Sequence, residues 1–330
     1  MDRRTFISGI AGGLLVAPLA AEAQQAGKVY RVGNLVIAGP TDASPPPPAN
    51  WESFQRGLRE LGYVEGQNIA FEHRYAHGRV DLFPDLAADL VRLSVDVILA
   101  RGPQAVTAAK NATRAIPIVG IDLESDWVMT GLVASISRPG GNITGMFLDL
   151  AELSGKQLQL LKELVPKLSR VAVLGDPAVN ASQLSALNVV GRSLAVQVQV
   201  LELKSSERLD GAFEEAKKGR AQALVTLSSP LNLASRSRIG ALAVKRMLPT
   251  MFLYTAHVEA GGLMSYGPDL PSMHGRCADY VARILRGAKP GDLPLERPAK
   301  FVTAINLKTA KALGLTIPPS LLQRADQVIE

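Results

Sequence analysis

The feature that most limits the fold is a regular alternation of short β-branched runs with segments that carry apolar residues at helical spacing. The run VYRVGNLV at 29–36 predicts a buried strand, and apolar residues at 51, 54, 58 and 61 predict a helix directly after it. The same succession returns between residues 154 and 253 without a visible sequence repeat. Alternating strands and helices imply parallel sheets covered on both faces by right-handed crossovers. We therefore expect an α/β fold with two lobes.

The length of 330 residues and the hydrophobic content of 47% supply enough material for two cores. We expect an N-terminal lobe over 28–147 and a C-terminal lobe over 148–260. Part of 261–290 is expected to cross back to the first lobe, and 291–330 to complete the lobes. The Pro- and Gly-rich link at 287–298 is then a predicted hinge. Ser154 and Gln157 have the spacing of a capping box and predict that a helix begins there.

The first 23 residues have the composition of an export signal peptide. Arg3 and Arg4 precede an apolar stretch, and Ala21 and Ala23 form an A-x-A cleavage signal. The start also resembles the twin-arginine pattern of bacterial signals. We expect cleavage after Ala23 and a periplasmic mature protein; a frayed or membrane-anchoring helix is the alternative. No later apolar run reaches the ~18 residues that span a membrane.

Composition argues against several other functions. The net charge is +6, but the basic residues are scattered and aromatic content is only 5%, so we expect no nucleic-acid partner. His73 and His77 lie where a strand gives way to a loop, and no metal site is expected from them. We found no G-x-S-x-G and no phosphate-loop pattern, so neither catalytic residues nor a cofactor are predicted. The single cysteine, Cys277, is expected to be a buried packing residue.

Ligands of open parallel sheets bind beyond the carboxyl ends of the strands. The stretch 121–145 is the clearest such place, because the acids Asp122, Glu124 and Asp126 directly follow a predicted strand and an RPGGN turn closes the segment. An ordinary loop with solvated acids is the alternative. The strand-end rule predicts these ligand-binding residues: Asn34, Gly39, Arg101, Gly102, Gln104, Asp122, Asp126, Trp127, Asp176, Ser228, Ser229 and Tyr254.

Two of these positions suggest a specific chemistry. The turn before Pro103 leaves the N–H groups of Gln104 and Ala105 free at a helix start, where they favour a carboxylate; a plain strand-to-helix turn is the alternative. Trp127 offers a flat apolar face that can stack on a planar ligand while Asp126 or Asp122 meets an ammonium group. The alternative for Trp127 is a core position beneath the loop.

Four motifs in order carry a family resemblance: GLRELGYVEGQN at 57–68, RPGGNITG at 138–145, GGLMSYGP at 261–268 and NLKTAKALGL at 306–315. Together they resemble the ABC-transporter substrate-binding protein family that includes the TrpX-like tryptophan and aromatic amino-acid binding proteins. The resemblance implies two Rossmann-like lobes of the type I periplasmic-binding-protein (Venus-flytrap) kind, with the ligand in the cleft. Two departures stand near that ligand: Asp126-Trp127-Val128 replaces the usual Asp-Pro-Val, and four prolines occupy 45–48.

The leading hypothesis is an exported, monomeric solute-binding receptor of an ABC importer. It would capture an amino-acid-like or other carboxylate-bearing small molecule and deliver it to a permease in the inner membrane. The second hypothesis is a periplasmic sensor that presents its closed form to a signalling partner. An enzyme on the same scaffold is a third, although no acid, base or nucleophile constellation favours it.

Overall fold

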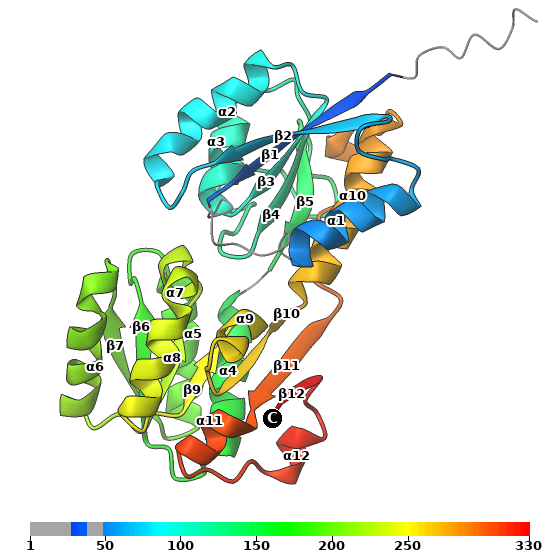
Figure 1. Ribbon diagram of the computed structural model, residues 1–330. Helices are drawn as coiled ribbons and strands as arrows, with labels where there is room; N and C mark the ends of the chain where they lie inside the picture. Colours follow the sequence, from blue (N-terminus) through cyan, green and yellow to red (C-terminus); the bar gives the residue numbers. More distant parts are fainter. Residues whose placement is uncertain (1–27, 38–48, 149) are drawn as a thin grey trace, which may run out of the picture.

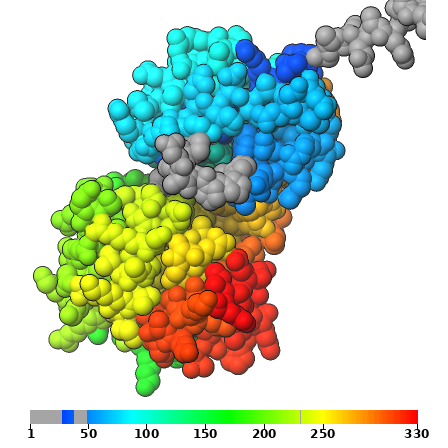
Figure 2. All heavy atoms as spheres, in the orientation of Figure 1, coloured from blue at the N-terminus to red at the C-terminus, as the bar shows by residue number. Residues whose placement is uncertain are grey.

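The computed structural model describes residues 28–37, 49–148 and 150–330 and shows two α/β lobes, one above the other (Figure 1). In the space-filling view the lobes are two rounded bodies that meet at a waist (Figure 2). The expected signal peptide, Gly39 and the four prolines at 45–48 lie outside the described residues. Within the described ranges, no helix has both the length and the apolarity needed to cross a membrane.

The N-terminal lobe contains a five-stranded parallel sheet in the order β2-β1-β3-β4-β5. Its strands are β1 (Tyr30–Val36), β2 (Ile69–Tyr75), β3 (Val97–Arg101), β4 (Ile118–Asp122) and β5 (Ile143–Phe147). Its helices are α1 (Ala49–Glu60), η1 (Val80–Leu82), α2 (Phe83–Arg92) and α3 (Pro103–Ala112). Strands β3, β4 and β5 are almost entirely buried, as expected for central parallel strands covered by helices on both faces.

The C-terminal lobe contains a seven-stranded sheet in the order β12-β11-β10-β9-β8-β6-β7. Its strands are β6 (Arg170–Gly175), β7 (Gln197–Glu202), β8 (Ala223–Thr226), β9 (Thr250–Phe252), β10 (Met264–Pro268), β11 (Phe301–Asn306) and β12 (Gln327–Ile329). Its helical segments are α4 (Leu150–Leu164), α5 (Ala181–Ser193), η2 (Ser206–Arg208), α6 (Leu209–Lys218), α7 (Pro230–Ala234), α8 (Arg236–Lys245), α9 (Thr255–Glu259), α11 (Leu307–Ala312) and α12 (Pro319–Leu322). The run β7-β6-β8-β9-β10 repeats the strand order of the N-terminal lobe.

The chain passes between the lobes at one edge of each sheet. Residues that follow β5 lead into α4 below, and Pro268 at the end of β10 leads into α10 (Leu270–Leu285), which packs against α1 in the upper lobe (Figure 1). The chain then passes η3 (Pro290–Asp292) and returns to β11. Since both exits leave from the carboxyl end of the fifth strand of a sheet, the carboxyl ends of the two sheets face each other.

The expectation of two α/β lobes with parallel sheets is confirmed, with one exception. Strand β11 pairs antiparallel with β10, because the chain re-enters the lower sheet after its excursion through α10. Five described elements had no expected counterpart: β5, α9, η3, α12 and β12. The predicted capping box is wrong. Helix α4 begins at Leu150, the Ser154 hydroxyl donates to the Leu150 carbonyl, and the Gln157 amide donates to the carbonyls of Phe252 and Tyr266.

Candidate ligand-binding site

The facing strand ends meet through a hydrogen-bond chain that joins the lobes. Glu124 follows β4 in the upper lobe, and its carboxylate accepts a 2.5 Å hydrogen bond from the hydroxyl of Ser228, which follows β8 in the lower lobe. The same hydroxyl lies 3.3 Å from the phenol oxygen of Tyr254, at the start of α9. Two of the predicted positions, Ser228 and Tyr254, are therefore brought together here with an acid from the opposite lobe.

Glu124 is a carboxylate in an unusual setting. Burial raises its pKa above the ordinary value, the Ser228 hydrogen bond opposes that shift, and the nearby Asp122 adds to it. Burial and the negative charge of Glu124 also raise the pKa of Tyr254. Among the described residues, Glu124 forms no ion pair, and the Ser228 hydroxyl is the side-chain donor to its carboxylate. A cationic group on a ligand would compensate this charge better than a hydroxyl can.

Arg101, the last residue of β3, carries a positive charge at the strand end next to the one that Glu124 follows. Its guanidinium Nη1 lies 3.4 Å from Nε2 of His274, and its Cζ lies 6.0 Å from the centre of the Trp51 ring. The Nε atom is buried and has no hydrogen-bond partner in the described structure. No carboxylate within the described residues pairs with this guanidinium. The Arg101 guanidinium is therefore a cation with at least one N–H donor, Nε, that has no hydrogen-bond acceptor in the described structure.

Helix α10 sets the protonation of this cluster. The Nδ1 atom of His274 lies 2.8 Å from the Leu270 carbonyl, so Nδ1 carries the proton and Nε2 accepts from Arg101. Burial and the adjacent guanidinium lower the pKa of His274 to about 3, which keeps the imidazole neutral at pH 7. Burial also lowers the pKa of Arg101 to about 10, so the guanidinium stays charged.

Aromatic side chains of α1 and β2 pack against one another beside this cation. The Trp51 ring makes edge contacts with Phe71, at 4.9 Å between centroids, and with His73, at 5.0 Å. His73 in turn stacks on Tyr75, at 5.6 Å and 6°. Burial raises the pKa of Tyr75 and the Arg101 charge opposes that shift, so the phenol lies within electrostatic reach of the guanidinium. The arrangement combines a cation with flat apolar faces.

Trp127 does not belong to this surface, and the prediction that it stacks on a ligand is wrong. Its side chain is 1% exposed and packs in the core of the upper lobe beneath the loop, beside Val106 and above Gly120. The indole N–H donates to Oδ2 of Asp122 at 2.9 Å. The core alternative is the one that the structure shows, because a glycine on β4 leaves room for the ring.

Asp122 does not meet a ligand either. It is fully buried, Oδ1 accepts from the backbone N–H groups of Glu124 and Ser125, and Oδ2 accepts from Trp127. Burial raises its pKa, and these hydrogen bonds oppose the rise. The prediction that Asp122 meets an ammonium group is therefore wrong. Asp126 is exposed, and its Oδ1 closes a turn with the N–H groups of Val128 and Met129; its ligand contact stays a prediction.

The remaining predicted residues divide into two groups. Gly102, at φ 97°, precedes α3, and Gln104 lies in the first turn of that helix beside Arg101. The others have local partners: the Asn34 amide nitrogen lies 3.0 Å from His73 Nδ1, Asp176 bonds the N–H of Ala178, and Ser229 caps α7. Their contact with a ligand stays a prediction.

Sequence reasoning missed several residues of this cluster: Glu124, Trp51, Tyr75 and His274. The sequence shows Glu124 as one of three acids after β4. It does not show that the flanking acids, Asp122 and Asp126, accept hydrogen bonds from backbone N–H groups of the loop. Trp51 and His274 come from helices that cover the sheet, where the strand-end rule does not search. The described residues hold no group of three His, Cys, Asp or Glu side chains that could bind a metal ion.

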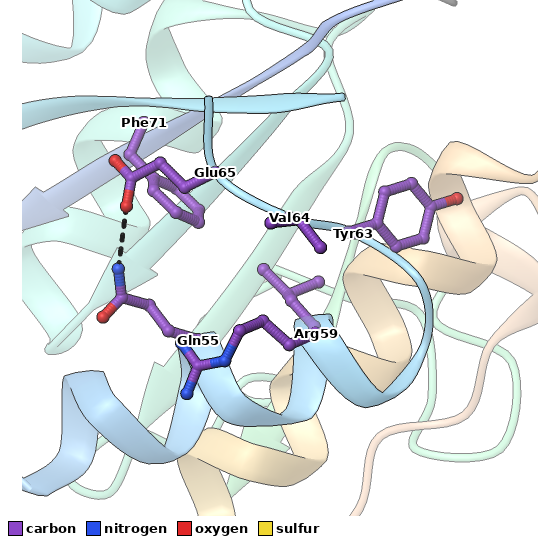
Figure 3. Close-up of a pocket in the computed structure, with 7 residues that line it drawn as sticks. Gln55, Arg59, Tyr63, Val64, Glu65 and Phe71 are labelled. Carbon is purple, nitrogen blue, oxygen red and sulfur yellow. Dashed lines mark hydrogen bonds between the residues drawn. The ribbon is translucent and has the colours of Figure 1, made fainter. Parts of the chain in front are cut away.

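A cavity of about 190 Å³ lies elsewhere on the upper lobe, between α1 and β2 (Figure 3). Gln55 and Arg59 of α1 face Val64, Glu65 and Phe71 across it, and the Gln55 amide donates to Glu65 at 3.0 Å. The cavity is formed largely by the motif at 57–68. This motif builds the turn between α1 and β2, so its place in the structure is away from the facing strand ends.

The comparisons with known proteins agree with this geometry. A family model described as ABC transporter substrate binding protein matches residues 48–329. The chain belongs to this family. A similar relative in the family is the tyrosine-binding protein of Clostridioides difficile, which is 26% identical over 266 residues, covering 80% of this chain and 76% of the relative.

Solved structures of substrate-binding proteins share the fold. A conserved domain protein from Vibrio cholerae is 25% identical with a TM-score of 0.82, covering 91% of this chain and all of that chain. A domain from Streptococcus pneumoniae in complex with L-Trp is 23% identical with a TM-score of 0.81, covering 92% of this chain and all of that one. The fold of this ABC transporter substrate-binding protein is that of type I periplasmic binding proteins.

Proposed function

We propose that this substrate-binding protein is an exported receptor that captures an aromatic α-amino acid between its lobes and delivers it to an ABC permease in the inner membrane. The observation that carries the proposal is Arg101, a half-buried residue whose buried Nε has no hydrogen-bond partner and whose guanidinium has no carboxylate partner among the described residues. A guanidinium in this state is completed by a carboxylate, which it binds through two parallel N–H donors.

The position of Arg101 supports a carboxylate for a second reason. The residue directly precedes α3, whose first turn presents free backbone N–H groups and whose N-cap, Gly102, supplies no capping side chain. The positive end of a helix and a guanidinium then act on the same anion. We therefore keep Gln104 and Ala105 as proposed N–H donors to that carboxylate.

Glu124 is the proposed partner of the ligand ammonium, in place of Asp122. Strands β3 and β4 are neighbours, with Arg101 paired to Ile121, so the cation and the acid lie at the ends of adjacent strands. A ligand that carries both an ammonium and a carboxylate group suits this pair of opposite charges.

The aromatic residues Trp51 and Tyr75 are proposed to contact the ligand side chain. The relative from C. difficile is a tyrosine-binding protein, and the similar structure from S. pneumoniae holds L-Trp, so an aromatic side chain is the class proposed here. A ligand that contacts Glu124 above and Ser228 or Tyr254 below touches both lobes. Such a ligand stabilises the closed arrangement in proportion to those contacts.

Calorimetric titration tests the proposal with a matched set of compounds: L-Trp, L-Tyr, tryptamine, which lacks the carboxylate, and indole-3-propionate, which lacks the amine. Arg101→Gln should weaken L-Trp or L-Tyr at least tenfold, since a hydrogen bond to a charged group contributes about 1.5–3 kcal/mol. Glu124→Gln should lower the affinity for L-Trp and L-Tyr but leave the affinity for indole-3-propionate nearly unchanged. The exposed Arg114→Gln is the charge-matched control. Equal affinity for tryptamine and L-Trp would contradict the assignment of Arg101.

A further inference from the structure

A second cavity, of about 340 Å³, lies at the hinge between the lobes. Each connection between the lobes contributes to its wall: Leu148 follows β5, Tyr266 belongs to β10, and Pro298 lies on the return to β11. The first turns of α4 complete it from the lower lobe. None of the residues assigned to the cleft lines this cavity, so it is a separate space with its own chemistry.

The inner wall of the hinge cavity is apolar and partly aromatic. The rings of Tyr266 and Phe301 stack at 5.8 Å between centroids and 24° between planes. Both side chains are partly exposed, whereas Leu148 and Leu153 beside them are 7% and 6% exposed. A flat apolar ring fits such a wall, because stacked aromatic faces favour a further ring at a similar spacing.

The rim of the hinge cavity is positively charged. The described lining residues include two cations, Lys156 of α4 and Arg297, and one carboxylate, Glu152. Neither cation forms an ion pair within the described structure, and the Arg297 guanidinium lies over the Phe147 ring at 5.4 Å. Two unpaired cations that line one cavity, one on α4 and one on the return to β11, attract an anionic group.

We propose that the hinge cavity binds a small aromatic carboxylate, with its ring against Tyr266 and Phe301 and its carboxylate between Lys156 and Arg297. The volume of 340 Å³ lies at the lower end of the range of small-molecule sites, ~300–1,000 Å³. The occupant contacts all three connections between the lobes, so its affinity differs between open and closed arrangements. By linkage, it changes the affinity of the cleft for its own ligand by the same factor.

Naphthalene-2-carboxylate is the probe, with naphthalene-2-carboxamide as its uncharged match, both titrated by calorimetry into the mature chain. The double variant Lys156→Gln/Arg297→Gln should weaken the carboxylate at least tenfold. The control double variant Lys218→Gln/Lys311→Gln removes two exposed cations elsewhere on the lower lobe and should bind like the wild type. The carboxamide should bind the wild type at least tenfold more weakly than the carboxylate.

A third protein, Arg101→Gln, separates the hinge from the cleft. If the hinge cavity is the site, this variant keeps its affinity for naphthalene-2-carboxylate while it loses affinity for the cleft ligand. Binding that is lost in Arg101→Gln and kept in Lys156→Gln/Arg297→Gln overturns the proposal, as does the absence of binding to the wild type at millimolar concentration. If the wild-type protein binds neither L-Trp nor L-Tyr while the hinge result holds, the proposed function alone is contradicted.

Discussion

At the scale of single residues, Trp127 shows that an aromatic side chain in a strand-end loop can serve the loop rather than a ligand. Its indole fills space above Gly120 and donates to Asp122, and Asp122 in turn holds the backbone of the loop that carries Glu124. The Trp–Asp pair therefore fixes where Glu124 lies. Trp127 stands where the family resemblance leads us to expect proline. The tryptophan therefore has a structural role at this position.

We predict that Trp127→Ala lowers the free energy of unfolding by about 3–5 kcal/mol, because it removes a fully buried large side chain. Trp127→Phe keeps most of the volume but leaves Oδ2 of Asp122 without its donor, and should cost about 1–3 kcal/mol. Urea denaturation measures both values. A variant with wild-type stability and reduced ligand affinity would show that the indole acts in the cleft instead.

His257 gives a residue-scale prediction about pH. It is 2% exposed and stacks on Phe252, and burial lowers its pKa to about 4. Between pH 6.5 and about 4 the folded protein holds this imidazole neutral while the unfolded chain protonates it. Stability therefore falls as pH falls, by about 1.4 kcal/mol per pH unit for each such histidine. His274 contributes in the same direction down to about pH 3.

His257→Gln should reduce the slope of unfolding free energy against pH, between pH 6 and 4.5, by about 1.4 kcal/mol per pH unit. This change corresponds to about one proton fewer taken up on unfolding. Chemical denaturation at a series of pH values measures that slope. The exposed His77→Gln is the matched control and should keep the wild-type slope. An unchanged slope in His257→Gln would mean that this imidazole is not held neutral by the fold.

At the scale of elements, the RPGGNITG motif is explained by the pairing of β4 with β5. Gly120 and Gly145 are register partners on these strands, and a Cβ on Gly145 would lie 2.0 Å from the Gly120 carbonyl oxygen. Gly145 also has φ of 143°, which side chains rarely adopt. The two backbones approach so closely that only glycine fits, and β5 then leads directly into the lower lobe.

Gly145→Ala should therefore destabilise the protein by roughly 2–6 kcal/mol, from backbone strain and overpacking together. Gly211→Ala is the matched control, because a Cβ there meets open space on α6. Replacing glycine inside a helix should raise stability by about 0.5–1 kcal/mol. Thermal unfolding of both variants checks the pair; equal melting temperatures would refute the close-approach argument.

The spacing of apolar residues and the β-branched runs predicted most of the helices and strands. Strand β1 follows from the run at 29–36, helix α1 from the apolar spacing at 51–61, and the start of α3 from Pro103. Strand β5 was missed because the two glycines before it indicated only a turn, although Ile143 and Phe147 have high strand propensity. The start of α4 was misplaced because Ser154 and Gln157 have capping spacing but make tertiary hydrogen bonds instead.

The site was harder to predict than the fold, and for a physical reason. Strand order predicted that Arg101, Ser228 and Tyr254 lie at strand ends, and the structure joins Ser228 and Tyr254 to Glu124 there, because topology decides which strand ends meet. Three acids follow β4, and two of them, Asp122 and Asp126, accept hydrogen bonds from groups of the loop itself. The acid that is left to interact outside the loop is therefore Glu124. That is decided by packing around Gly120 and Trp127, which one sequence does not reveal.

At the scale of the whole molecule, the lobes are joined by three connections at one side and by a hydrogen bond at their facing ends. The first lobe and the run β7-β6-β8-β9-β10 share one strand order, so equivalent strand ends are presented from both sides. The Ser228–Glu124 hydrogen bond joins the two lobes directly. A ligand ammonium that takes over Glu124 releases Ser228, so the bridge and the ligand compete for one carboxylate.

The last prediction concerns this bridge. A hydrogen bond to a charged group contributes about 1.5–3 kcal/mol, so Ser228→Ala should lower the ratio of bridged to separated lobes roughly 10- to 150-fold in the ligand-free protein. Spin labels on cysteines introduced at the exposed positions Thr107 of α3 and Lys218 of α6 report the distance between the lobes by double electron–electron resonance. The native Cys277 is buried and does not compete for the label.

The labelled Ser228→Ala protein should show a broader distribution that extends to longer distances, while labelled Ser193→Ala, whose hydroxyl bonds only within α5, should match the parent. Addition of a ligand that bridges the lobes should narrow both distributions, because the ligand then supplies contacts that the serine had supplied. Identical distributions for Ser228→Ala and the parent would mean that the three connections alone set the angle between the lobes, and that the bridge follows closure instead of stabilising it.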